Sequence, residues 1–168
     1  MAKAKRVYWD SCAWLGLLNK EDGRKRPLEI IYNGARDGSY ELWTSTYSLV
    51  EVNRYEHEMG KPKPLSAENL DLIKAFFNQP FIKLLPVDME IADMARKLVR
   101  ETPKLSKRPD AVHLASAIRW SLDEMHTYDG SDLLHLSEKF ATKAGTLIKI
   151  CVPDEASDGP LFAALGKG

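Results

Sequence analysis

Short apolar segments and amphipathic helices alternate along almost the whole chain, and this alternation constrains the fold more than any other feature of the sequence. We predict strands at 6–9, 40–44, 81–85, 124–128 and 146–152, and helices at 13–18, 27–35, 46–57, 66–77, 89–100, 109–120 and 131–140. Strand–helix alternation favours a mainly parallel sheet with helices on both faces. We therefore expect an α/β domain of three layers, α/β/α, with a small sheet. The 168 residues are enough for one such domain and its core.

The ends of the chain bear on location and on domain limits. Asp10 interrupts the apolar segment near the N-terminus, and no small-residue cleavage site follows it, which argues against a signal peptide. No apolar stretch approaches the length of a membrane span. We therefore expect a cytoplasmic protein that does not bind membranes. The folded domain should cover residues 1–152, and the Gly-, Asp- and Ala-rich segment 153–168 should be a loosely ordered tail.

Four acidic residues follow or flank the predicted strands. Asp10 follows the first strand, Asp129 follows the fourth, Glu51 lies in the helix after the second, and Asp110 opens a later helix. Ligands of open α/β sheets bind at the carboxyl ends of the strands, so these four carboxylates can converge there. Each also has a simpler explanation. The three aspartates can be a helix cap, a helix-start residue and a turn residue, and Glu51 can form an ion pair with Arg54.

Carboxylates that share one pocket repel each other, and a divalent cation removes that repulsion. Cys12 and Cys151 lie far apart and show no zinc-ligand spacing, so a thiolate site is not expected. Oxygen ligands alone favour Mg²⁺ or Mn²⁺. Such an ion can activate water and stabilise the charge that builds on a phosphodiester. The formal net charge of zero argues against binding of nucleic acid by bulk charge, although it permits local basic patches.

The segments around the four acids resemble the four acidic motifs of the PIN-domain family, in the family's order. The resemblance extends from about Val7 to Val152, and the third segment is the most specific. The matching segments are Val7-Tyr8-Trp9-Asp10-Ser11, Thr44-Ser45-Thr46-Tyr47-Ser48-Leu49-Val50-Glu51-Val52, Asp110-Ala111-Val112-His113-Leu114-Ala115-Ser116-Ala117 and Thr127-Tyr128-Asp129-Gly130-Ser131-Asp132-Leu133.

This resemblance implies a function as well as a fold. It implies Mg²⁺- or Mn²⁺-dependent endonucleolytic cleavage of RNA, with the metal held by Asp10, Glu51, Asp110 and Asp129 and assisted by Asp132. Many small members are VapC-like toxins paired with an antitoxin protein, so an antitoxin partner and a homodimer are also implied. The chain is somewhat long for that group.

Further polar residues near the acids are candidates for substrate binding. They are Ser11, Thr46, Lys107, Arg108 and Thr127. Helix capping or ordinary solvation explains hydroxyl and basic residues at such positions equally well. His113 can touch substrate or donate a proton, but a locally hydrogen-bonded, buried histidine is the expectation we favour.

Three other functions remain open from the sequence. They are a nuclease that acts on DNA, a non-catalytic scaffold that binds RNA or protein, and a phosphoacceptor receiver-type domain. The paired acids and the later lysine that are usual in receivers are not visible here.

Overall fold

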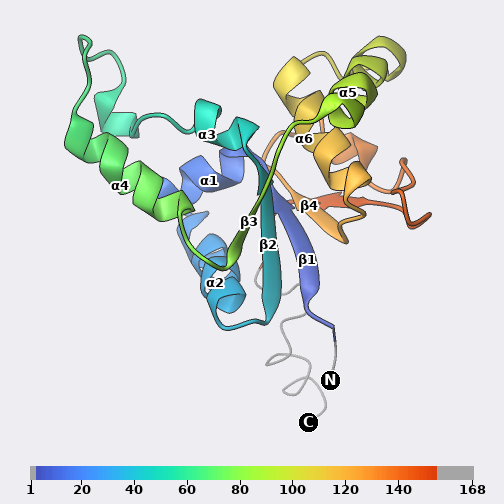
Figure 1. The fold of residues 1–168 in the computed structure, drawn as a ribbon, viewed down its shortest axis with the longest axis horizontal. Helices are drawn as coiled ribbons and strands as arrows, with labels where there is room; N and C mark the ends of the chain where they lie inside the picture. The colour runs from blue at the N-terminus through green and yellow to red at the C-terminus, as the bar shows by residue number, and fades with distance from the viewer. Residues whose placement is uncertain (1–2, 155–168) are drawn as a thin grey trace.

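A five-stranded sheet forms the middle layer of the computed structural model, which describes residues 3–154 (Figure 1). All four strand pairings are parallel, and the strand order is β3-β2-β1-β4-β5. The sheet thus confirms the predicted α/β class. The strands are β1 (Lys5–Trp9), β2 (Tyr40–Ser45), β3 (Ile82–Leu85), β4 (Glu124–His126) and β5 (Lys149–Cys151).

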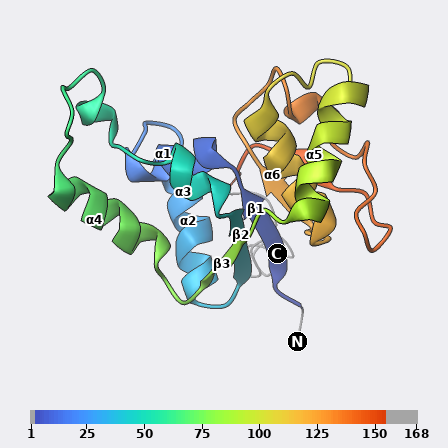
Figure 2. The same ribbon diagram turned by 45° about the horizontal axis from the view of Figure 1, so that its top comes forward.

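Helices cover both faces of this sheet, as the alternation predicted (Figure 2). The helices α1, α2 and α4 lie on one face and α5 and α6 on the other. Side chains alternate across β1, so Val7 and Trp9 enter the first core whereas Tyr8 enters the second. The helices are α1 (Ser11–Leu18), α2 (Lys25–Arg36), α3 (Tyr47–Glu51), α4 (Ala67–Phe77), α5 (Met89–Glu101) and α6 (Arg108–Arg119), with 3₁₀ turns at Glu56–Glu58 and Leu134–Leu136.

The predicted helix 46–57 is wrong in its second half. The helix α3 ends at Glu51, and the chain then runs irregularly to the 3₁₀ turn at Glu56–Glu58. The side-chain amide of Asn53 donates to the carbonyl oxygen of Val50 at 2.7 Å. An asparagine that satisfies a helical carbonyl in this way replaces the next helical hydrogen bond, so the helix stops.

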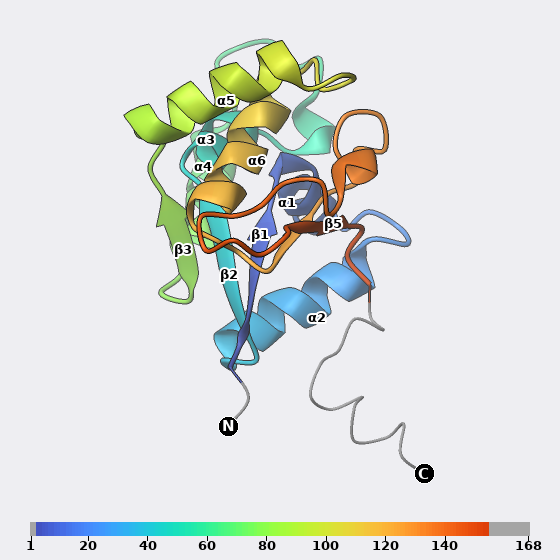
Figure 3. The ribbon, with the colours of Figure 1, turned by 90° about the vertical axis from the view of Figure 1, so that its right-hand side faces the viewer.

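The predicted helix 131–140 is also wrong. Only Leu134–Leu136 is helical, as a 3₁₀ turn. The carboxylate of Asp129 accepts the backbone N–H groups of Ser131 and Asp132, each at 2.9 Å, and forms a turn. Glu138 has a φ of 59°, which no α-helix allows. The chain leaves this turn as a loop that passes beside β5 (Figure 3).

The last two strands are shorter than predicted, since β4 ends at His126 and β5 covers only Lys149–Cys151. Trp9 and Trp14 are fully buried, whereas Trp120 is 37% exposed. No helix within residues 3–154 is long and apolar enough to cross a bilayer. Most of the predicted tail, from residue 155 onward, lies outside the described residues.

Candidate active site

The four predicted acids all lie at the carboxyl edge of the sheet, the upper end of the strands in Figure 1. Asp10 directly follows β1 and caps α1, where its Oδ1 accepts the N–H of Ala13 at 3.1 Å. Glu51 is the last residue of α3, which follows β2. Asp110 lies in the first turn of α6, and Asp129 follows β4. Parallel strands therefore bring together residues that are far apart in the sequence.

Three carboxylates form the tightest part of the site. Asp110, Asp129 and Asp132 each offer an oxygen, and these oxygens lie within 4.8 Å of one another. Asp110 and Asp132 are 9% and 5% exposed, so the group is shielded from bulk water. Carboxylates packed this closely, with so little solvent, require positive charge or protons among them.

Lys107 supplies part of that positive charge. Its Nζ lies 2.5 Å from Oδ2 of Asp129 and 3.9 Å from Oδ2 of Asp110. Burial alone would raise the pKa of Asp129, but the hydrogen bonds from Lys107 and from the N–H of Asp132 hold that pKa well below its usual range. Asp129 is therefore ionised and paired with an ammonium group.

Asp132 ties the loop before α6 to the site. Its Oδ2 accepts the backbone N–H groups of Ser106 and Lys107, each at 3.0 Å, and its Oδ1 accepts the hydroxyl of Ser131 at 3.1 Å. Burial opposes ionisation of Asp132, but these backbone hydrogen bonds lower its pKa. Because both of its oxygens already accept hydrogen bonds, Asp132 anchors the neighbouring segment in addition to contributing charge.

Asp110 is the least satisfied of the acids. Its Oδ2 is buried and accepts no hydrogen bond from the described residues. Burial, followed by the negative charge of Asp129, raises the pKa of Asp110 to about 7. A buried carboxylate oxygen without a hydrogen-bond partner indicates a place where a cation or water belongs.

Asp10 is joined to the group through Thr127. The buried Thr127 hydroxyl hydrogen-bonds to the Asp10 carboxylate and accepts the backbone N–H of Asp129 at 3.0 Å. Burial raises the pKa of Asp10, and this hydrogen bond and the nearby His113 oppose that rise. Thr127, which the sequence placed among the substrate-binding candidates, thus orients two of the acids.

Glu51 is held by a buried chain of polar side chains. Its Oε2 lies 2.5 Å from Nε2 of His113, and Nδ1 of His113 lies 2.6 Å from the Tyr8 hydroxyl. That hydroxyl accepts the backbone N–H of Ser45 at 3.2 Å. Burial raises the pKa of Tyr8, so the phenol stays protonated and its O–H is available for the hydrogen bond with Nδ1. The hydrogen bond between Nε2 of His113 and Oε2 of Glu51 fixes the direction of that carboxylate.

The thiol of Cys12 lies close enough to all four predicted acids to be affected by their charges. Burial raises the pKa of its thiol to about 12, and the negative charges of Asp10, Asp110, Asp129 and Glu51 all add to the rise. The tightest group nevertheless contains Asp110, Asp129 and Asp132, while Asp10 and Glu51 lie beside it.

The donor atoms fit a hard divalent cation. All are carboxylate oxygens, one of them lacks a hydrogen-bond partner, and an ammonium group already lies between two of them. Oxygen-only sets of this kind select Mg²⁺ or Mn²⁺ over zinc.

A model of the PIN domain matches residues 7–138, which is most of the chain. The chain is a PIN-domain protein. This match confirms the resemblance seen in the four acidic segments, and it places the chain in a family of nucleases. No curated protein matches this PIN domain.

Solved structures share the fold of this PIN domain at low sequence identity. The toxin VapC20 of Mycobacterium tuberculosis, described as cleaving the sarcin–ricin loop, is 18% identical with a TM-score of 0.56, and the match covers 74% of this chain and 90% of that chain. A toxin–antitoxin complex from Klebsiella pneumoniae is 19% identical with a TM-score of 0.55, covering 89% and 98%. VapBC2 of Rickettsia felis, bound to promoter DNA, is 14% identical with a TM-score of 0.53, covering 74% and 88%.

The remaining predicted residues of the PIN domain differ in how close they come to the acids. Ser11 is the first residue of α1, next to Asp10. Thr46 makes no side-chain cap to α3, whereas the hydroxyl of Ser45 accepts the N–H of Tyr47 at 3.0 Å. Arg108 is exposed and lines a surface hollow with Arg96 and Arg100, between α5 and α6.

Two residues that build the PIN-domain site were not singled out for it from the sequence. Tyr8 was treated only as part of a buried strand, although its position between Val7 and Trp9 places it on the opposite face of the sheet, toward α6. Ser131 donates to Asp129 at 2.9 Å and to Asp132. Its place between those two acids is the signal that could have identified it.

Proposed function

We propose that this PIN domain is a Mg²⁺- or Mn²⁺-dependent endoribonuclease that hydrolyses phosphodiester bonds in RNA. The observation that carries the proposal is the trio Asp110, Asp129 and Asp132, with a buried oxygen of Asp110 that has no hydrogen-bond partner among the described residues. Membership of a nuclease family supports the reaction class. RNA as substrate is supported by the resemblance of the four acidic segments and by the fold shared with a toxin that cleaves the sarcin–ricin loop.

In this proposal, Asp10, Glu51, Asp110 and Asp129 hold the metal and Asp132 assists them. When bound, the metal supplies Lewis-acid activation of water and neutralises charge on the phosphodiester. Thr127 holds Asp10 in place, and the chain from Tyr8 through His113 holds Glu51. These side chains fix the geometry before substrate arrives, so little reorganisation accompanies the reaction.

Lys107 is the strongest candidate for contact with the RNA backbone. Its side chain is 52% exposed, and its ammonium group now neutralises Asp129 and Asp110. When a divalent cation neutralises those acids, the ammonium group is free to pair with a phosphate oxygen. We propose weaker contributions to RNA binding from Ser11, Thr46, Thr127 and Arg108.

We further propose that the protein is the cytoplasmic toxin of a toxin–antitoxin pair, acting as a homodimer that a cognate antitoxin inhibits. The fold shared with the Klebsiella toxin–antitoxin complex, over 89% of this chain, supports an antitoxin partner. We place the nuclease domain at 1–152 and treat 153–168 as an appended tail. Sedimentation of the purified protein, alone and with the product of an adjacent small gene, tests both associations.

The deciding experiment is cleavage of a fluorescent single-stranded RNA, with a matched DNA strand, in Mg²⁺, Mn²⁺ or EDTA. We expect metal-dependent cleavage of the RNA strand, and loss of at least ~100-fold in Asp110→Asn because that variant removes a metal ligand. Asp71→Asn is the matched control, because Asp71 lies exposed on α4 and, among residues 3–154, pairs with Lys74 alone. Cleavage in EDTA or in Asp110→Asn would contradict the metal site. Preferential cleavage of DNA would contradict the substrate, and RNA binding without cleavage would indicate a scaffold.

A further inference from the structure

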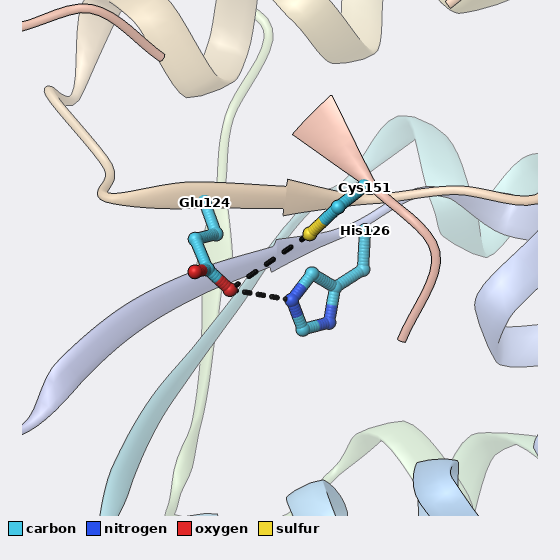
Figure 4. A group of neighbouring side chains, drawn as sticks. All are labelled: Glu124, His126 and Cys151. Carbon is cyan, nitrogen blue, oxygen red and sulfur yellow. Dashed lines mark hydrogen bonds and ion pairs between the residues drawn. The ribbon is translucent and has the colours of Figure 1, made fainter. Parts of the chain in front are cut away.

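A second group of potential metal ligands lies between β4 and β5, on the α1–α2 face of the sheet (Figure 4). Glu124 and His126 are two residues apart on β4, so their side chains point to the same face. Cys151 is the register partner of His126 on the parallel strand β5, which places its side chain beside that of His126. The pleat and the register thus bring a carboxylate, an imidazole and a thiol together.

The donor atoms of the three residues have the spacing of a coordination site. Oε2 of Glu124 lies 2.9 Å from Nε2 of His126 and 4.0 Å from Sγ of Cys151, and all three donor atoms are within 4.8 Å of one another. Figure 4 shows the imidazole and the thiol both turned toward this carboxylate. Glu124 and His126 are 5% and 1% exposed, and Cys151 is partly buried.

The other oxygen of Glu124 is already satisfied. Oε1 accepts Nζ of Lys5 at 3.0 Å and Nζ of Lys149 at 3.1 Å. Ligating carboxylates in metal sites are commonly held in this way by outer hydrogen bonds to the non-ligating oxygen. The two lysine side chains are 26% and 49% exposed, so solvent screens their charge.

The second ring nitrogen of His126, Nδ1, points away from Glu124 and Cys151 (Figure 4). It is buried and has no hydrogen-bond partner among residues 3–154. Such an atom indicates a further acceptor beside Nδ1, such as a water molecule, which would hold the proton on Nδ1 and leave Nε2 facing Glu124 and Cys151. The pairing of His126 with Glu124 alone therefore leaves the imidazole incompletely satisfied.

The charges that most affect the two cysteines differ. The charges that act on Cys151 include those of Glu124, Lys149 and Lys5, whereas Cys12 experiences Asp10, Asp110, Asp129 and Glu51. The donor chemistry differs as well. Oxygen, nitrogen and sulfur together match borderline-soft ions such as Zn²⁺, whereas the acids offer only oxygen.

We propose that Glu124, His126 and Cys151 form a second metal site that binds Zn²⁺ with three protein ligands and one open position. On binding, Cys151 Sγ loses its proton to solvent and forms a bond to the metal. The neutral imidazole carries its proton on Nδ1, which leaves the Nε2 lone pair for the metal. The ion fastens β5 to β4 at the edge of the sheet. Cysteine spacing does not reveal such a site, because the strand register brings Cys151 beside a ligand 27 residues away in the sequence.

Cobalt binding tests the proposal without a nuclease assay. Co²⁺ added to metal-free protein should give a thiolate-to-cobalt charge-transfer absorption that Zn²⁺ abolishes by displacement. The absorption should persist in Cys12→Ser and disappear in Cys151→Ser, so the two cysteines act as each other's control. No absorption in the wild type, or loss in Cys12→Ser instead, overturns the proposal.

Alkylation of the wild-type protein gives the same answer without relying on a variant that folds. Iodoacetamide labelling of Cys151, mapped by mass spectrometry, should slow at least ~10-fold in Zn²⁺ and remain unchanged in Mg²⁺, which does not bind thiolates. Equal labelling of Cys151 with and without Zn²⁺ overturns the site. Because the measurement concerns Cys151 alone, its result is independent of whether the acidic site cleaves RNA.

Discussion

Three aspartates of this site each stabilise the local backbone and also present a carboxylate to the site. Asp10 caps α1, Asp110 lies in the first turn of α6, and Asp129 closes a turn through its Oδ1. The simple structural explanations considered from the sequence are therefore correct for all three, and they do not compete with the site. The same hydrogen bonds that fold the backbone locally also fix where each carboxylate points.

His113 provides the sharpest prediction at the residue scale. His113→Gln should lower kcat/KM for RNA cleavage by about 10–100-fold, the usual cost of losing a group that orients a metal ligand. Mn²⁺ affinity, followed by electron paramagnetic resonance, should fall in parallel, because Glu51 loses the partner 2.5 Å away that directs it. His57→Gln is the control, since His57 is exposed. Wild-type Mn²⁺ affinity in a folded His113→Gln protein would argue against this positioning role.

The lowered pKa of Glu124 leads us to expect a pH-dependent stability of the metal-free protein. Burial opposes ionisation of Glu124, but the hydrogen bonds from His126 and Lys5 lower its pKa from 4.5 to about 2. A lowered folded-state pKa stabilises the protein above the unfolded-state value, and this contribution disappears as pH falls through the folded-state value. In EDTA, the wild type should be more stable than Glu124→Gln above pH 4.5, and the difference should shrink toward about pH 2. Urea titrations across this range measure it, and a difference that does not change with pH would contradict it.

The acids could be predicted from the sequence because each lies just after a strand or in a helix near the carboxyl ends of the strands. The order of strands and helices is enough to place them at that edge of the sheet. The residues that hold them were less visible. The sequence indicates Thr127 and His113 as candidates for substrate contact but not which acids they hold, and it places Tyr8 only within a strand. Their roles depend on side-chain contacts between residues as far apart as Tyr8 and His113, and periodicity carries no information about such contacts.

At the scale of elements, Trp14 joins four segments of the core on the α1–α2 face of the sheet. Its ring packs against Trp9 of β1, Tyr32 of α2 and Phe77 of α4, and its Nε1 donates to the Thr44 hydroxyl of β2 at 3.0 Å. Through these contacts α1, which begins at Asp10, is fixed against the sheet.

Trp14→Phe should therefore destabilise the domain by about 2 kcal/mol, from the lost hydrogen bond and the cavity that the smaller ring leaves. Trp120→Phe is the matched control and should cost less than about 0.5 kcal/mol, because Trp120 is 37% exposed. The free energy of unfolding in urea measures both variants. Equal losses in the two variants would show that Trp14 does not join these elements as described.

The elements that sequence reasoning placed well are those with long, regular apolar patterns, such as α2, α5 and α6. The predicted helices are wrong at two places where a polar side chain forms hydrogen bonds with backbone groups. Asn53 ends α3 early, and Asp129 turns the chain where a helix was predicted. Apolar spacing favours a helix at both places, but a local side-chain hydrogen bond overrides it.

At the scale of the whole molecule, repulsion among the acids should lower the free energy of unfolding, and a bound metal ion should raise it again. An excess of Mg²⁺ or Mn²⁺ near 100 times the dissociation constant stabilises a protein by about 2.7 kcal/mol. For a chain of this size we expect Tm to rise by about 5–10 °C. Differential scanning fluorimetry should show this rise in the wild type and in Cys151→Ser, but not in Asp110→Asn. A rise of the same size in Asp110→Asn would place the bound ion elsewhere.

The strand order could be anticipated only in part from the sequence. Alternation predicted a parallel sheet with two covered faces, and the structure confirms both. The central position of β1, between β2 and β4, depends on which strands pair, and nothing in the composition of these short segments specifies that choice.

That central position has a consequence during synthesis. β1 pairs with β4, which follows it by more than a hundred residues, so β1 is synthesised long before its partner strand. A nascent chain that has reached α5 contains Asp10 and Glu51 but none of the three acids of the tightest group. Products that end before β4 therefore lack Asp129 and Asp132, and those that end before α6 lack all three acids of the tightest group.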